Sequence, residues 1–135
     1  MDGWPQMSDA IVDYYFEKKL AYRHIKRSQA PFAVIADELA DWNIRLYACN
    51  DTLEEKAGHL RVWDADTEEV LLETDFKAVK NTSTLIAPLR IFYSEKRLLI
   101  FDWDVNGEKG RNHYLCGYPP FDFKRYCSWI EKGLI

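Results

Sequence analysis

The chain has 135 residues, of which 47% are hydrophobic and 15% are aromatic, and it carries a formal net charge of −4. That length suits a single domain with a short appended segment, and the apolar share is sufficient for a hydrophobic core. The weak acidic charge argues against nucleic acid and anionic membranes as partners, and no apolar run approaches the ~18 residues that a membrane-spanning helix requires.

The cysteines favour free thiols over disulfide bonds. Cys49, Cys116 and Cys127 are odd in number and have no repeating spacing, which argues against a disulfide framework. We expect buried thiols, and unpaired thiols favour a reducing, cytoplasmic environment. A secreted or periplasmic parent protein stays open.

The first fifteen residues contain more large aromatic side chains than a dispensable terminus needs. Trp4, Tyr14 and Tyr15 lie in this stretch, ahead of the region that has the pattern of a self-contained domain. Chain termini are usually either dispensable or tied into the core. We therefore interpret the chain as the tail of a larger protein, and expect residues 1–8 to be poorly anchored here or held by a neighbouring copy.

A basic helix is predicted over residues 18–28. Leu20, Ala21, His24 and Ile25 form a narrow apolar stripe at helical spacing. Pro31 ends the helix, because a proline disfavours the α conformation in the residue before it. Five cations cover the remaining surface: Lys18, Lys19, Arg23, Lys26 and Arg27. Such a run is either a solvated helix face or a docking face for an acidic partner.

Short segments with a period of two follow from residue 32 onwards. The clearest alternation covers 42–49, where Trp42, Ile44, Leu46 and Ala48 share one face, which predicts a strand with that face in a core. Further strands are predicted over residues 32–36, 59–63, 70–76 and 111–116. A segment that begins at Thr82 is also β-rich, and it is expected to stop at Pro88.

The last third of the chain predicts a hairpin and a helix. Leu99 to Val105 alternate in the same way, and the Asn106–Gly107 pair behind them is typical of a type I′ turn. A short helix is predicted over 121–132, with Gly133 as its stop. Its expected apolar side consists of Phe123, Tyr126, Cys127 and Ile130.

About seven short strands with turn residues between them predict a mainly β fold. The pattern favours an immunoglobulin-like antiparallel β-sandwich with an N-terminal helical segment and a short C-terminal helix. We expect two parts, residues 1–29 and the sandwich at 30–135.

No complete catalytic or metal site is predicted within the chain. Residues 102–107 match the start of a calcium loop, but the twelfth position is His113 in place of the required carboxylate. His113, Cys116 and Cys127 are too few for a closed zinc site, and His113 and Cys116 point to opposite faces of a strand. No nucleophile elbow is present. We therefore expect no catalytic residue, no metal and no cofactor.

Tyr47 and Trp63 are predicted to point outward from their strands. Aromatic side chains on a sandwich can stack against sugar rings, so a carbohydrate-binding module that uses these two residues is the alternative function. The other interpretation is that the N-terminal segment, the C-terminal helix or an absent domain covers them. A third possibility is a protein-interaction domain that associates with itself when its partner is missing.

The N-terminal stretch resembles the end of the catalytic barrel in family 2 glycoside hydrolases, in particular the β-mannosidase-like branch. The resemblance is carried by residues 2–5 (Asp-Gly-Trp-Pro), 11–15 (Ile-Val-Asp-Tyr-Tyr), Lys19-x-Ala21-Tyr22, Lys26-Arg27 and Ala30-Pro31. It continues weakly through residues 50–52, 112–115 and 119–120. In that family a C-terminal β-sandwich follows the barrel.

The resemblance implies a non-catalytic C-terminal domain that supports the barrel of a parent enzyme. Such a parent hydrolyses β-glycosides, β-mannosides in the best-fitting branch, with retention, using two glutamates about 5 Å apart. Those glutamates come from earlier barrel strands, so the resemblance places none of them in this chain. It makes residues 1–29 a remnant of the last barrel strand and its exit helices, and it assigns Trp4 to the wall of the parent's sugar-binding pocket. The implied partners are that barrel and, through it, a carbohydrate.

Overall fold

The computed structural model describes residues 10–135. Contacts between Cα atoms divide the chain into two compact units, Met1–Ala30 and Pro31–Ile135. The expectation about residues 1–8, together with Trp4, lies outside the described residues. No helix within residues 10–135 is long and apolar enough to span a membrane.

The described part of the first unit contains one helix, α1, Leu20–Ser28. It is two residues shorter than the predicted helix at its N-terminal end, where Lys19 is the extended N-cap residue. A β-bridge between Val12 and Lys18 closes a turn ahead of it. None of the nine helical residues is buried, although a helix of this length needs packing of its apolar face for stability.

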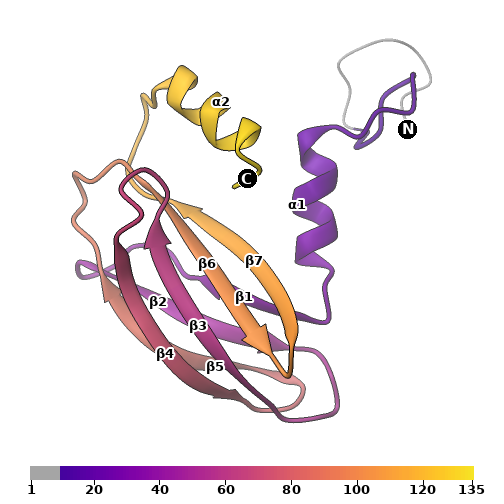
Figure 1. Ribbon diagram of the computed structural model, residues 1–135, viewed down its shortest axis with the longest axis vertical. Coiled ribbons are helices and arrows are strands. Elements are labelled where there is room, and N and C mark those ends of the chain that lie inside the picture. Colours follow the sequence, from indigo (N-terminus) through magenta and orange to yellow (C-terminus); the bar gives the residue numbers. More distant parts are fainter. Residues whose placement is uncertain (1–9) are drawn as a thin grey trace. The chain divides into compact units, whose positions relative to one another are not determined.

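The second unit is an antiparallel β-sandwich, as predicted (Figure 1). One sheet has the order β1-β2-β5, and the other has the order β4-β3-β6-β7. The strands of the first sheet are β1 Phe32–Ala36, β2 Asn43–Asn50 and β5 Thr82–Arg90. Those of the second sheet are β3 Lys56–Asp64, β4 Val70–Ala78, β6 Leu98–Val105 and β7 Glu108–Leu115.

Alternate residues of both sheets form the core between them. Val34, Ile44 and Leu46 come from the three-stranded sheet, and Leu60 and Phe101 come from the four-stranded sheet; all five are fully buried. This is the outcome that a period of two predicts for strands with one covered face. Outward-facing residues that stay exposed are therefore the ones available for function, and Ile100 is an outward-facing residue that is buried.

The predicted hairpin between β6 and β7 is confirmed. Asn106 and Gly107 have φ angles of 54° and 86°, the two positive values that a type I′ turn requires. The carboxylate of Asp104 accepts a hydrogen bond from the Gly107 amide at 2.8 Å. Across the same pair of strands, Trp103 lies so close to Gly110 that a Cβ there would come within 2.3 Å of the indole, so only glycine fits.

Two strand limits differ from the predictions. Trp42 lies outside β2, in a tight turn, and its side chain is 50% exposed; the expected core position is wrong. β5 continues through Pro88 to Arg90. Proline is tolerated there because β5 is an edge strand of its sheet, so the missing amide costs no ladder bond on the open side.

The C-terminal helix, α2, covers Phe123–Glu131. Tyr126, Cys127 and Ile130 of its predicted apolar side are partly buried, but the prediction is wrong for Phe123. Phe123 is 76% exposed, whereas Trp129 is buried. Trp129 donates a hydrogen bond from its indole to Asp66 at 2.9 Å, and Arg125 forms an ion pair with the same carboxylate. These contacts to a turn after β3 hold Trp129 in its buried position.

Both ends of α2 have regular caps. The Asp122 side chain accepts hydrogen bonds from the amides of Lys124 and Arg125, the usual way to satisfy the first free amides of a helix. At the other end the Gly133 amide bonds to the carbonyl of Ile130 and the Leu134 amide bonds to that of Trp129. Gly133 has a φ of 68°, which completes a Schellman motif at the predicted stop.

Candidate functional site

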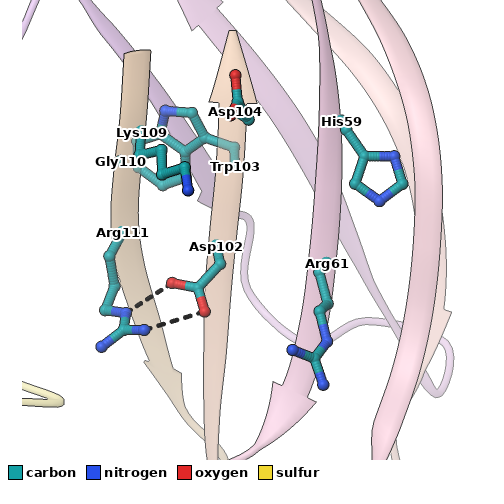
Figure 2. Close-up of a pocket in the computed structure, with 8 residues that line it drawn as sticks. All are labelled: His59, Arg61, Asp102, Trp103, Asp104, Lys109, Gly110 and Arg111. Atoms are coloured by element: carbon teal, nitrogen blue, oxygen red, sulfur yellow. Dashed lines mark hydrogen bonds and ion pairs between the residues drawn. The ribbon is translucent and has the colours of Figure 1, made fainter. Parts of the chain in front are cut away.

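The outer face of the four-stranded sheet carries a shallow pocket lined by charged side chains (Figure 2). Its volume is about 610 Å³. The lining residues come from β3, β6 and β7, and they are His59, Arg61, Asp102, Trp103, Asp104, Lys109, Gly110 and Arg111. The strand register explains the grouping, because Asp102 pairs with Arg61 on one side and with Arg111 on the other.

Asp102 is the centre of a cross-strand network in this pocket. Arg111 donates two hydrogen bonds to it, at 2.6 and 3.0 Å, as Figure 2 shows, and Trp63 donates a third from its indole at 2.8 Å. Burial of Asp102 acts to raise its pKa, but the hydrogen bonds from Arg111 and Trp63 outweigh this and leave the pKa below its usual value. The carboxylate therefore stays ionised, as a partner in a structural ion pair.

His59 forms a second charged group at the side of the pocket. Its Nδ1 lies 2.8 Å from a carboxylate oxygen of Asp75, and its Nε2 lies 3.1 Å from one of Glu73. Hydrogen bonds to Asp75 and then to Glu73 raise the pKa of His59. Both partners belong to β4, where Asp75 lies opposite His59 and Glu73 lies opposite Arg61, the next residue on the same face. The arrangement joins the two strands through surface charges.

This pocket does not have the properties of a glycosidase active site. A general acid needs a carboxyl group that keeps its proton near neutral pH, whereas the pKa of Asp102 is lowered. Asp104 is engaged by the hairpin turn. Residues 10–135 contain no group of three or more His, Cys, Asp or Glu side chains arranged to hold a metal ion. The pocket is a network of cross-strand pairs on a solvated sheet face.

The outer face of the three-stranded sheet carries a row of apolar side chains next to an ion pair between Arg45 and Asp37. Ile35 pairs with Tyr47, which pairs with Leu85, so the three side chains lie side by side across β1, β2 and β5. Ile35 is 40% exposed and Leu85 is 52% exposed. The sequence had no signal for this row, because it depends on which strands are neighbours.

An aromatic cluster lies at one end of this sheet. The indole of Trp42 contacts the ring of Tyr93 edge-on, with centroids 4.9 Å apart, and that of Phe92, at 6.0 Å. The guanidinium of Arg90 lies over the Phe92 ring at 5.5 Å. Trp42 and Phe92 are both about half exposed. Sequence reasoning missed this cluster because it assigned Trp42 to the core side of a strand.

The two aromatic residues that the alternative function uses lie on different sheets. Tyr47 is on the outer face of the three-stranded sheet, and Trp63 is on the outer face of the four-stranded sheet. Both are partly exposed. Since the two sheets face each other through the core, these side chains point away from each other and form no common platform.

The three cysteines are free thiols. Cys116 is buried in the core, and burial raises the pKa of its thiol to about 12. Cys49 and Cys127 are partly exposed. The buried Cys116 is therefore inert, since the thiolate is the reactive form.

Comparisons with known proteins point to one group of enzymes. No family model matches the chain. Beta-mannosidase B from Thermothelomyces thermophilus is 31% identical over 154 aligned positions, which cover 96% of this chain and 17% of that protein. The chain therefore spans about a sixth of the length of the curated relative that it matches.

A solved structure gives the same fold. The crystal structure of the beta-D-mannosidase from Dictyoglomus thermophilum matches with a TM-score of 0.65 and 21% sequence identity. The match covers 84% of this chain and 15% of that one. At this identity the likeness concerns the sandwich fold, and again it covers only a small part of a much longer protein.

Proposed function

We propose that this chain is a non-catalytic C-terminal β-sandwich domain of a family 2 glycoside hydrolase of the β-mannosidase-like type, and that it supports the catalytic barrel of a longer enzyme. That enzyme would hydrolyse β-glycosides, in particular β-mannosides, with retention of configuration. The observation that carries the proposal is the match along 96% of this chain to only 17% of a beta-mannosidase.

The chemistry of the described residues agrees with a supporting role. Retaining hydrolysis needs a carboxyl group that acts as an acid next to a carboxylate nucleophile, about 5 Å apart. Asp102 is held ionised by Arg111 and Trp63, and the other carboxylate of the pocket, Asp104, accepts the Gly107 amide in the hairpin turn. We therefore assign catalysis to the barrel of the longer enzyme.

Residues 1–29 are proposed to be the end of that barrel and the segments that leave it. In this proposal Trp4 lines the sugar-binding pocket of the longer enzyme. The described part of the unit supports the idea through α1, whose residues are all partly or fully exposed. An amphipathic helix of nine residues with no buried side chain gains little from its own fold and has an apolar stripe available for a partner.

We do not propose the carbohydrate-binding module. Trp63 is engaged by Asp102 through its indole N–H, and Arg111 lies 5.9 Å from its ring. Tyr47 lies between two exposed aliphatic side chains, without the converging polar groups that orient a sugar. Self-association of the isolated chain stays a prediction, and light scattering at increasing concentration tests it.

A domain exchange tests the proposed function. In one form of Beta-mannosidase B the matched region is deleted, and in a second form it is replaced by this chain. We expect the deletion to inactivate the enzyme and the replacement to restore hydrolysis of an aryl β-mannoside, while the isolated chain shows no turnover. Turnover by the isolated chain, or full activity of the deletion form, would refute the supporting role.

A further inference from the structure

The outer face of the three-stranded sheet has the character of a protein interface. We propose that this docking face binds the folded catalytic barrel of the longer enzyme. The inference rests on the proposed function, since it names the surface through which the domain supports the barrel. The docking face consists of Ile35, Tyr47, Leu85, Arg90, Phe92 and Trp42.

The first argument is that two apolar groups, a row of side chains and the aromatic cluster, lie on one sheet face, on either side of the ion pair between Arg45 and Asp37. Ile35, Tyr47 and Leu85 form a row across all three strands. Arg90 is exposed, whereas Leu89 and Ile91 on either side of it are buried. Outward-facing and buried residues therefore alternate from Leu89 onwards, so Arg90 and Phe92 both point to the outer face. Apolar side chains grouped in this way mark interaction sites, while single ones do not.

The second argument is the backbone at Trp42. Residues 40–43 form a two-residue turn, closed by hydrogen bonds between Ala40 and Asn43 at 2.8 and 2.9 Å. Asp41 and Trp42 have φ angles of 49° and 63°, so Trp42 occupies a position that strongly favours glycine. A bulky residue with positive φ is an outlier. The turn tolerates this strain and presents a half-exposed indole at the surface, which favours a functional role.

The third argument is composition, which indicates the kind of surface that the partner presents. Tryptophan, tyrosine and arginine are the residues most enriched among binding hot spots, and the docking face contains all three. Among the described residues Arg90 has no carboxylate partner, and its contact is with the Phe92 ring. The expected partner is therefore an apolar protein surface with an acidic group near Arg90. Because the chain corresponds to only 17% of its relative, most of that relative's surface lies in its other domains.

A sugar ligand fits this face less well. Sugar sites need several converging polar groups beside the aromatic ring. Of the polar groups near Trp42, the Asn43 amide is engaged by the Asp41 carbonyl at 2.7 Å, and the Glu95 carboxylate accepts a bond from the Phe92 amide at 3.2 Å. The test below separates the two occupants.

Hydroxyl-radical footprinting measures the exposure of these side chains directly. It is applied to the isolated chain and to the replacement form of Beta-mannosidase B. We expect oxidation of Trp42 and Phe92 to fall about fivefold in the replacement form, since half-exposed side chains become buried at the core of an interface. Leu53 and Tyr118, which are exposed elsewhere, serve as the reference.

Three results would overturn the inference. Unchanged oxidation of Trp42 and Phe92 in an active replacement form would show that another surface docks, and the proposed function would survive. Low oxidation already in the isolated chain would mean that the chain itself covers the face. A saturable decrease on addition of manno-oligosaccharide to the isolated chain would indicate a sugar site. An inactive replacement form would instead count against the proposed function.

A pair of variants separates docking from the domain's own stability. In the replacement form, Trp42→Gly is expected to shorten the half-life of thermal inactivation about tenfold, because a hot-spot side chain is lost. In the isolated chain the same change should leave the urea midpoint equal or higher, because glycine adopts positive φ without strain. Leu53→Gly is the matched control and should leave the half-life unchanged. An equal loss of stability in both forms would show that Trp42 acts only in local packing.

Discussion

Replacement of Asn50 by alanine should destabilise the sandwich more than any other single polar substitution in it. Asn50 is fully buried at the end of β2. Its amide donates to the carbonyls of Glu54 at 2.8 Å and Val79 at 3.2 Å, and its oxygen accepts from the amide and hydroxyl of Thr52 at 3.1 and 2.7 Å. One side chain thus joins the loop after β2 to the loop after β4.

The size of the effect follows from these four bonds. A typical hydrogen bond contributes about 1 kcal/mol net, and each buried partner left unsatisfied costs about 1–3 kcal/mol. Water can replace part of the lost hydrogen bonding to Thr52 and Glu54, because both lie in a partly exposed loop. We therefore expect Asn50→Ala to lower the free energy of unfolding by about 3 kcal/mol. With a urea slope of about 1.5–2 kcal/mol/M, the midpoint falls by about 1.5–2 M.

Urea unfolding of the 135-residue chain, followed by tryptophan fluorescence, measures this change. Asn112→Ala is the matched control, because the Asn112 amide makes one bond, to the Val34 carbonyl at 3.0 Å, and its loss should cost about 1 kcal/mol. Asn50→Asp keeps the shape but turns two donors into acceptors against carbonyl oxygens, so it should not rescue stability. A change below about 0.5 kcal/mol for Asn50→Ala, within the range of ordinary surface substitutions, would refute the reasoning.

Three further predictions concern charges and thiols. Asp66→Ala removes the acceptor that holds Arg125 and Trp129, so hydrogen exchange in α2 should become faster while exchange in the sheets stays unchanged; equal protection of α2 in the variant would contradict this. His59 has a raised pKa in the folded chain, so its contribution to stability is fully present below about pH 6.5 and is lost as the pH rises through the folded pKa. The difference in urea midpoint between the wild type and His59→Gln should shrink over that range, and a difference that grows with pH would contradict the assignment. A thiol reagent at pH 8 should modify Cys49 and Cys127 in the native chain but reach Cys116 only in denaturant, because burial raises its pKa to about 12; rapid reaction of all three native thiols would show that Cys116 is accessible.

The fold was predictable from the sequence wherever local patterns decide it. The alternation in β6 set its buried face, and Asn106–Gly107 set the hairpin that follows, because only residues that tolerate positive φ fit a type I′ turn. Gly133 likewise predicted the end of α2. In each case the residues that carry the sequence pattern are the residues that form the structure, or lie within a few positions of it.

Predictions failed where distant residues decide. Trp42 continues an apolar alternation, yet the turn at residues 40–43 removes it from β2. Phe123 was expected on the buried side of α2, yet it is exposed, whereas Trp129 is buried and donates a hydrogen bond to Asp66, which lies far away in the sequence. A polar anchor of this kind leaves no periodic pattern in the sequence.

The two candidate surfaces also depend partly on local sequence patterns and partly on contacts between distant residues. The sequence alone determined that the chain is a β-sandwich and that its N-terminal stretch resembles the end of a glycosidase barrel. Only the tertiary structure decided which outward side chains meet, namely Asp102 with Arg111 and Trp63 on one sheet, and Ile35 with Tyr47 and Leu85 on the other. The physical reason is that alternation sets which face a side chain takes, while strand order and register, which depend on pairing between distant segments, set its neighbours.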